Sequence, residues 1–332
     1  MVALALLRWR GHGIENPPAC YASPPMLFAF LTTLCWSTSS VAARRLVEAL
    51  GTLTANLVRL ALAAVLLAVL AFTVGRGLEG AGIWWFAASG VIGFGLGDLG
   101  LYFALSTLGS RLTVLMTQTL AAPIGALVEW LWLGTSLAPA ELACGAGVLG
   151  GVALALVPSD NPHVAPGNLR RGLAWGLLAA SGQGVGAVVS RRAFELSAAG
   201  GLRVDGLTAA FQRILGGLVV GLLAWLLWRA RAGKDAAAGA LDAPRPRAPI
   251  PAGRLAALIL AVVLLGPVVG VACYQAALSS APSGVVLPIV ALCPVVIIPF
   301  SARFEGDRPA LRSLVGAALA VASAIALATV RR

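Results

Sequence analysis

Long apolar stretches separated by short polar ones make up most of this chain. Ten stretches carry at most one ionisable side chain each, and about 18 to 24 residues suffice to cross a bilayer as a helix. They lie at residues 26–43, 52–74, 82–105, 112–133, 139–157, 171–190, 206–228, 254–277, 284–302 and 310–330. The stretches are rich in Ala, Gly and Leu without the alternation of strands. We therefore expect an all-α integral membrane protein with ten transmembrane helices.

The composition agrees with this class and narrows the partners. Mean hydropathy is +0.91, with 59% hydrophobic and 11% charged residues, far from the average of soluble domains. The net charge of +11 comes mainly from basic residues between the stretches, which suits lipid headgroups rather than nucleic acid.

We expect no metal site, because the cysteines are dispersed without a CxxC or Cys/His cluster. No GxxxxGK[ST] motif occurs, and we expect no cofactor. The expected partners are the bilayer and a small-molecule substrate, and no oligomeric state is predicted.

Polar segments divide the chain into units. Residues 1–25 contain an apolar stretch too short for a signal peptide, and we interpret them as an N-terminal tail. Residues 158–170 are expected to be a linker between the first five stretches and the last five. Residues 229–253, rich in basic residues and proline, are expected to form a polar loop. The two units are therefore residues 26–157 and 171–330.

Matching sequences recur in the two units in the same order. Leu53–Arg59 (LTANLVR) reads again as Leu207–Arg213 (LTAAFQR). Three further pairs follow the same order: Arg44-Arg45 with Arg191-Arg192, Tyr102 with Tyr274, and Pro123 with Pro294. Ordered matches of this kind indicate an internal duplication. Since each copy has five stretches, the second copy begins on the opposite face of the membrane, which predicts two inverted five-helix repeats. Many alternating-access transporters have this arrangement, with the substrate site between the halves.

These residues also resemble the drug/metabolite transporter superfamily, in its ten-helix branch with two EamA domains. The similarity rests on Trp36-Ser37-Thr38-Ser39, on the early arginines Arg59 and Arg213, and on Gly97–Leu105 continuing to Pro123. A Leu-Gly-Glu-Arg-Leu signature is kept in part as Phe304-Glu305-Gly306-Asp307-Arg308, whereas the first copy, Leu133–Leu137, has no acid. The resemblance covers about residues 26 to 330. It implies export of amino acids, other small metabolites or drugs, in many relatives with a proton gradient.

An ionisable side chain inside a span is expected to have a structural or functional role, because its insertion at a helix centre costs about 2.5 to 3.5 kcal/mol of free energy. Asp98, in a glycine-rich segment one turn before Tyr102, could carry a proton or bind a substrate amine. Alternatively it is a structural partner of Arg59 or Arg213, or lies nearer the interface. We interpret Arg59 and Arg213 as structural charges that brace the repeats, with binding of a substrate carboxylate as the alternative. Glu129, near the end of its span, is expected to reach the interface.

Several uncharged polar or aromatic residues are candidates for a substrate cavity. Together with Asp98 they are Trp36, Ser37, Tyr102, Gln118, Gln183, Tyr274 and Gln275. Tyr102 and Tyr274 occupy similar points of the third and eighth spans, which suggests opposite walls of one cavity. A buried glutamine needs hydrogen-bond partners, which either a substrate or a neighbouring helix could supply.

The sequence predicts a secondary transporter, an exporter in the cell membrane. An intramembrane enzyme is less favoured, because His12 and His163 lie outside the spans and no HExxH or GxSxG motif occurs. A non-transporting scaffold or sensor would have a dry, apolar interface between the repeats.

Two orientations in the membrane follow from different observations. Eight basic residues on the side of the termini against fourteen opposite favour termini outside, whereas the family resemblance implies termini in the cytoplasm.

Overall fold

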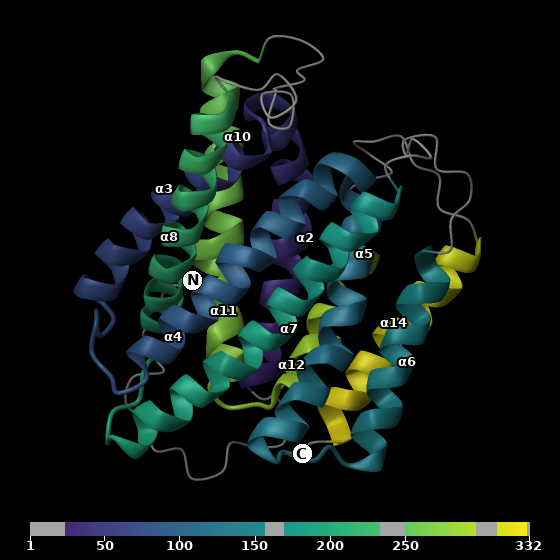
Figure 1. Cartoon of the computed structure of the whole chain (residues 1–332). Helices are drawn as coiled ribbons and strands as arrows, with labels where there is room; N and C mark the ends of the chain where they lie inside the picture. The colour runs from purple at the N-terminus through teal and green to yellow at the C-terminus, as the bar shows by residue number, and fades with distance from the viewer. Residues whose placement is uncertain (1–23, 157–168, 233–249, 297–310, 331–332) are drawn as a thin grey trace.

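A computed structural model describes residues 24–156, 169–232, 250–296 and 311–330 (Figure 1). Every regular element in these ranges is a helix. The first half contains α2 (Pro24–Leu50), α3 (Thr52–Thr73), α4 (Ile83–Gly90), the π-helical η1 (Val91–Gly97), α5 (Asp98–Leu133) and α6 (Pro139–Leu156). The second half contains α7 (Leu169–Ala199), α8 (Gly206–Ala232), α10 (Ala252–Val263), the π-helical η2 (Leu264–Val268), α11 (Val269–Leu278), α12 (Ser283–Val290) and α14 (Leu311–Val330).

The predicted all-helical membrane fold is confirmed, and an apolar helix coincides with each predicted span. Seven of the described helices are long and apolar enough to cross a bilayer. Three further apolar helices, Pro139–Leu154, Ser283–Val296 and Leu314–Leu327, are shorter. Ten complete crossings therefore stay a prediction. Most of the predicted tail, linker and polar loop lies outside the described residues, as do both histidines and the Phe304–Arg308 motif.

Local sequence accounts for several helix ends. Asp205 caps α8, since its carboxylate accepts hydrogen bonds from the Thr208 amide (2.9 Å) and hydroxyl (2.7 Å). The left-handed conformation of Gly134 (φ 69°) ends α5. Within α5, Gly109 (φ 78°, ψ 174°) breaks the helix between the predicted third and fourth spans. Helix α12 ends at Val290, and a proline accounts for this end. Pro294, four residues later, offers no amide to the Val290 carbonyl.

The third helix of each half contains a π-helical segment that the sequence analysis did not predict. Helices α4, η1 and α5 continue one another up to Gly109, and α10, η2 and α11 do so from Ala252 to Leu278. A π segment inserts a wider turn and reorients the side chains that follow, and such segments occur often at functional sites. Both segments contribute to the walls of the cavity described below.

The helices form one bundle with a layered arrangement (Figure 1). Helices α6 and α14 pack together at one edge, and α3, α4 and α8 lie at the other. Helices α2, α5, α7, α11 and α12 fill the space between them. The bundle has an end, here called the terminal end, where α2 begins and α11 and α14 finish: Met26, Leu278 and Leu327 share one core cluster there. This arrangement places residues from both halves in the middle of the molecule.

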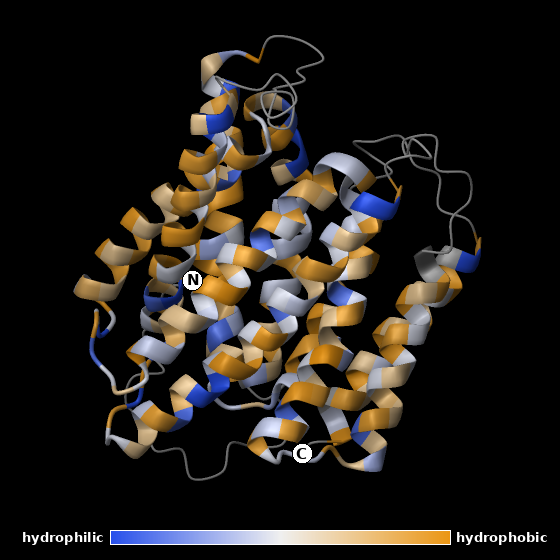
Figure 2. Ribbon diagram, in the orientation of Figure 1, coloured by the Kyte–Doolittle hydropathy of each residue, from blue (hydrophilic) through white to orange (hydrophobic). Residues whose placement is uncertain are grey.

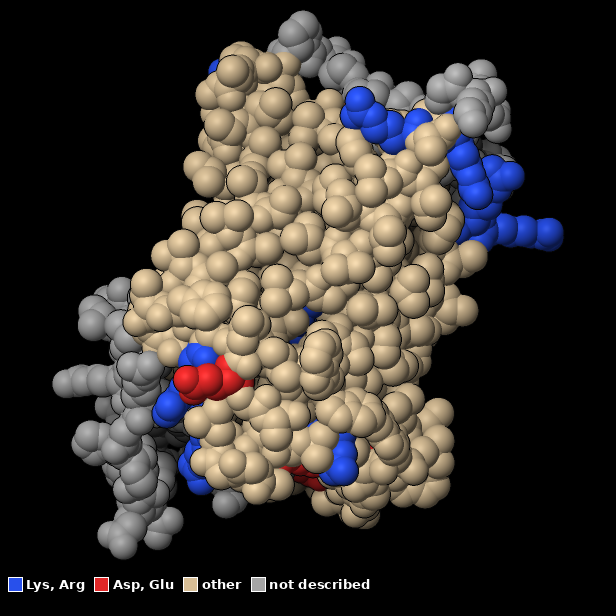
Figure 3. All heavy atoms as spheres, turned by 60° about the vertical axis from the view of Figure 1, so that its left-hand side comes forward, with Lys and Arg blue, Asp and Glu red and all other residues tan. Residues whose placement is uncertain are grey.

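Glycines allow the close approach of helices, as expected for packing within a membrane. Gly97 and Gly182 face each other, so that a methyl group on Gly182 would overlap Gly97 Cα. Gly151 lies against the backbone of Ala320 in the same way, where α6 meets α14. The outer faces are strongly apolar, with Trp84 80% and Leu131 68% exposed. Hydrophobic residues run along the helices in Figure 2, and a broad nearly uncharged band separates the charged ends in Figure 3. Such a surface suits lipid.

Candidate functional site

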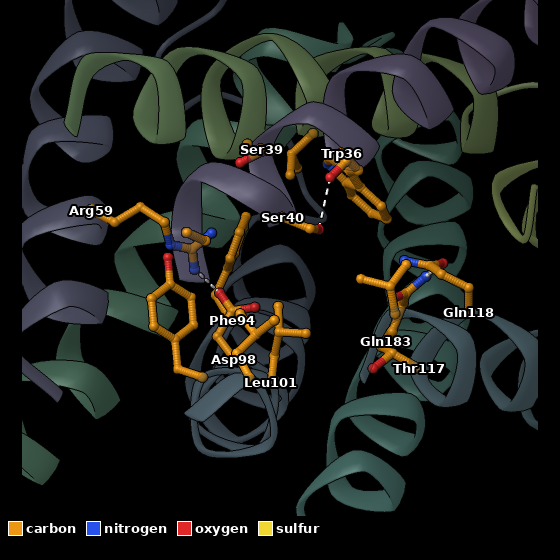
Figure 4. Close-up of a pocket in the computed structure, with 16 residues that line it drawn as sticks. Trp36, Ser39, Ser40, Arg59, Phe94, Asp98, Leu101, Thr117, Gln118 and Gln183 are labelled. Atoms are coloured by element: carbon orange, nitrogen blue, oxygen red, sulfur yellow. Dashed lines mark hydrogen bonds and ion pairs between the residues drawn. The ribbon is translucent and has the colours of Figure 1, made fainter. Parts of the chain in front are cut away.

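A cavity of about 90 Å³ lies where the two halves meet (Figure 4). Its walls come from α2, α3, η1, α5, α7, η2 and α11. The lining residues are Trp36, Ser39, Ser40, Ala43, Arg59, Phe94, Asp98, Leu101, Tyr102, Leu105, Val114, Thr117, Gln118, Gln183, Gly266 and Val271. A second compartment of about 60 Å³ adjoins it, shares Trp36, Phe94, Asp98 and Gln183 with it, and adds Arg213 and Tyr274. The cavity is thus polar in part and built from both halves.

One wall carries a buried ion pair. Asp98, the first residue of α5 after the π segment, accepts a hydrogen bond from Arg59 of α3. The Asn56 side chain accepts a second bond from the same guanidinium at 3.2 Å. The Arg59 and Asp98 side chains are only 7% and 15% exposed. This pair joins two helices of the first half and neutralises both charges within the cavity wall.

The second intramembrane arginine has different surroundings. Arg213 of α8 is 5% exposed, and its guanidinium lies over the Phe94 ring at 5.3 Å from the centroid. Arg59 lies near the same ring at 5.9 Å. Among the described residues no carboxylate forms an ion pair with Arg213. The two arginines, equivalent in sequence, therefore meet at one aromatic ring with only one of them paired.

The opposite wall is uncharged and polar (Figure 4). Gln183 of α7 donates a hydrogen bond to Gln118 of α5 at 2.7 Å, which joins the two halves. Thr117 lies beside them and donates to the carbonyl of Thr113 at 2.8 Å. After this bond the Gln183 amide retains one N–H and its oxygen, and the Gln118 amide retains both N–H groups and one oxygen lone pair. This wall can therefore bind polar groups of a ligand.

Aromatic side chains provide the apolar part of the lining. The Trp36 and Tyr274 rings lie 5.0 Å apart between centroids. Arg59 stands over the Tyr102 ring at 5.1 Å. The hydroxyls of Tyr102 and Tyr274 are buried, and neither has a hydrogen-bond partner among the described residues. The two tyrosines line adjoining compartments, Tyr102 the larger and Tyr274 the smaller.

Six of the predicted cavity residues line these compartments. They are Trp36, Asp98, Tyr102, Gln118, Gln183 and Tyr274. Ser37 is not on the cavity, because its hydroxyl faces the other side of α2 and bonds to the carbonyls of Thr33 (2.6 Å) and Cys293 (3.1 Å). Gln275 also lies outside both compartments, fully buried one residue beyond Tyr274. Helical geometry explains both cases, since adjacent residues point about 100° apart.

The structure adds lining residues that the sequence analysis missed. Ser39, Ser40 and Thr117 line the cavity, and Phe94 contacts both arginines. The period of an α-helix places Ser40 on the same face as Trp36, and this signal could have identified it. Phe94 gave no such signal, because an aromatic residue in an apolar span is expected to pack against lipid or core.

The expectation that Glu129 reaches the membrane interface is wrong. Glu129 is 2% exposed and forms an ion pair with Arg191 of α7 at 2.8 Å. It also accepts hydrogen bonds from the Ser283 amide (2.6 Å) and hydroxyl at the start of α12. Arg191 in turn donates to the carbonyls of Leu278 (3.1 Å) and Ala281 (2.8 Å). These contacts join α5, α7, α11 and α12 at the terminal end, where α11 finishes.

Apolar helices long enough to span a bilayer, with a small polar cavity between two halves, define a multi-pass membrane protein of the transporter type. A model of the EamA-like transporter family matches the chain twice, at residues 23–157 and 170–329. The chain therefore belongs to the EamA-like transporter family and is a membrane transporter of the drug/metabolite superfamily. A solved structure titled "Crystal structure of protein" shares the fold, with a TM-score of 0.67 and 19% identity over 94% of this chain and 98% of that one. No curated protein matches the chain.

Proposed function

We propose that this chain is a secondary transporter that exports a small metabolite, such as an amino acid or a drug-like amphiphile, across the cell membrane by alternating access. The observation that carries the proposal is the cavity to which both halves contribute polar groups, Asp98 and Gln118 from the first and Gln183 and Arg213 from the second. In inverted-repeat transporters the substrate site lies at this position. Two inverted repeats of five helices belong to the same proposal.

The polar interface distinguishes transport from a scaffold or sensor role. A protein that only holds a shape in the bilayer has no need for ionisable groups at mid-depth, where each is costly. Here Arg59, Asp98 and Arg213 lie together inside the helical bundle, next to open space rather than in a dry contact. The π segments at the third helix of each half supply places where those helices can change shape.

Asp98 is the proposed site of proton coupling. Protonation would remove its negative charge and so release Arg59, which now donates to it. The cavity would then hold two arginines without a carboxylate, and substrate or deprotonation would be needed to balance them. This exchange links the charge state of Asp98 to occupancy of the site.

The test uses the full chain in proteoliposomes with a panel of labelled amino acids, organic acids and amphiphilic amines, with and without a pH gradient. We expect movement of at least one compound, faster with the gradient, and we expect Asp98→Asn to reduce its rate to that without the gradient. Glu79→Gln is the control, since the Glu79 side chain is 64% exposed. Gradient-driven transport by a folded Asp98→Asn protein would overturn the coupling, and failure to move any compound would favour the scaffold.

A further inference from the structure

The charges around the cavity do not balance among the described residues. The two compartments contain two guanidinium groups, those of Arg59 and Arg213, and one carboxylate, that of Asp98. Asp98 is engaged with Arg59. One positive charge, on Arg213, therefore remains in a site where a buried charge without a partner is strongly unfavourable. A ligand with a single negative charge would restore neutrality.

Two glycines make room for the Arg213 guanidinium beside the smaller compartment. Gly93 and Gly186 border it, and a methyl group at Gly93 would stand 2.8 Å from Arg213 Nη2. The Nε atom is buried without a hydrogen-bond partner among the described residues. The hydroxyl of Tyr274, which lines the same compartment, is also buried without a hydrogen-bond partner among the described residues. Two donors from the second half thus have unused hydrogen-bonding capacity at a compartment of about 60 Å³.

We propose that Arg213 and Tyr274 form a subsite for the carboxylate of a monoanionic substrate, an inference that rests on the proposed transport function. A guanidinium presents parallel donors that match the two oxygens of a carboxylate. Trp36 and Phe94 border the same compartment and offer apolar contact to the carbon skeleton next to the carboxylate. A phosphate dianion fits less well, because it would exceed the single positive charge and lie near Asp98.

The duplicated arginines thereby acquire separate roles. Arg59 forms an ion pair with Asp98, so the two charges in the first half neutralise each other. Arg213 receives its counter-ion from the substrate. A purely bracing Arg213 would be expected to have a carboxylate or several carbonyl groups as partners, as Arg191 has. Arg213 instead has the Phe94 ring, which stabilises a cation without neutralising it.

Binding to the purified full chain tests the subsite without requiring transport. The probes are benzoate, acetate and inorganic phosphate, with benzamide and acetamide as uncharged counterparts, measured by calorimetry and by the shift in melting temperature. We expect a carboxylate to bind and its amide not to. We expect Arg213→Gln to weaken carboxylate binding about 10- to 100-fold, with partial retention in Arg213→Lys. Arg76→Gln, at a half-exposed arginine, is the control and should bind as the unmodified chain does.

A second measurement guards against misfolding. Without ligand, Arg213→Gln should melt at or above the temperature of the unmodified protein, since it removes an unbalanced buried charge. A lower melting temperature with unchanged carboxylate binding would identify Arg213 as a brace and overturn the subsite. Equal binding of amides and acids, phosphate as the only ligand, or no binding of any carboxylate would overturn it too. Transport of a carboxylate from the panel by an Arg213→Gln protein with unchanged kinetics would reject the subsite and leave the transport function standing.

Discussion

Single residues in this protein differ in function even where the duplication makes them equivalent. Arg59 and Arg213 follow the same sequence phrase and meet at the Phe94 ring, yet only Arg59 has a carboxylate partner among the described residues. The difference comes from Asp98, which has no counterpart at the corresponding place in the second half, where Gly270 precedes Tyr274 by the same four residues. One acidic residue thus makes a duplicated scaffold chemically asymmetric.

The Arg59–Asp98 pair is expected to stabilise the fold mainly by avoiding an unbalanced charge. Arg59→Gln should reduce the free energy of unfolding by about 3 to 5 kcal/mol, because Asp98 would remain buried without its cation. The double variant Arg59→Gln/Asp98→Asn should recover much of this loss, since neither charge remains. Denaturant unfolding in detergent, followed by circular dichroism, measures both effects. Losses that simply add in the double variant would contradict this role of the pair.

At the scale of elements, glycine contacts determine how closely the two halves approach. Gly97, at the end of η1, faces Gly182 of α7, and the cavity residue Gln183 follows directly. A side chain at either glycine would push the π segment away from α7. The position of the polar wall relative to the Arg59–Asp98 wall therefore depends on this backbone contact.

Gly182→Ala provides a sharp test, because the added methyl group would overlap Gly97 Cα. We expect a loss of about 1 to 3 kcal/mol in the free energy of unfolding, the usual cost of overpacking. Gly150→Ala is the matched control, since nothing lies within 4 Å of a methyl group there. That variant should gain up to about 1 kcal/mol from helix propensity. Equal effects of the two substitutions would show that the η1–α7 contact does not limit the packing.

At the scale of the whole molecule, hydropathy predicted every described apolar helix, and the ordered matches predicted the duplication that the family match confirms. Ionisable and amide side chains are rare in the spans, so six residues of the cavity lining could be selected from the sequence. Their partners could not. Glu129 and Ser283 lie 154 positions apart, and only the packing of α12 on α5 brings them together. The π segments were not predicted either, although Pro267, which offers no amide to the helix, lies within η2.

The contacts of Glu129 with Arg191 and Ser283 hold the terminal end of the bundle closed in the described state. The cavity lining reaches Ala43, Leu105 and Val114, near the ends of helices opposite the terminal end. At the terminal end, Glu129, Arg191 and Ser283 join helices of both halves, and Ser283 to Leu292 are buried without interruption. Alternating access through that end would require the ion pair between Glu129 and Arg191 to separate.

Thiol labelling can measure this closure. In a chain whose five cysteines are replaced by alanine, Ala281→Cys places a thiol at a residue that is 2% exposed and whose carbonyl accepts a bond from Arg191. A membrane-impermeant maleimide applied from the terminal end should react slowly with it. Glu129→Gln should increase the rate about tenfold or more, because the closed state loses a buried charge pair while the open state does not. Glu141→Gln, at an intermediate-exposure carboxylate at the start of α6, should leave the rate unchanged. A labelling rate that is the same in all three proteins would show that closure of the terminal end does not depend on the pair.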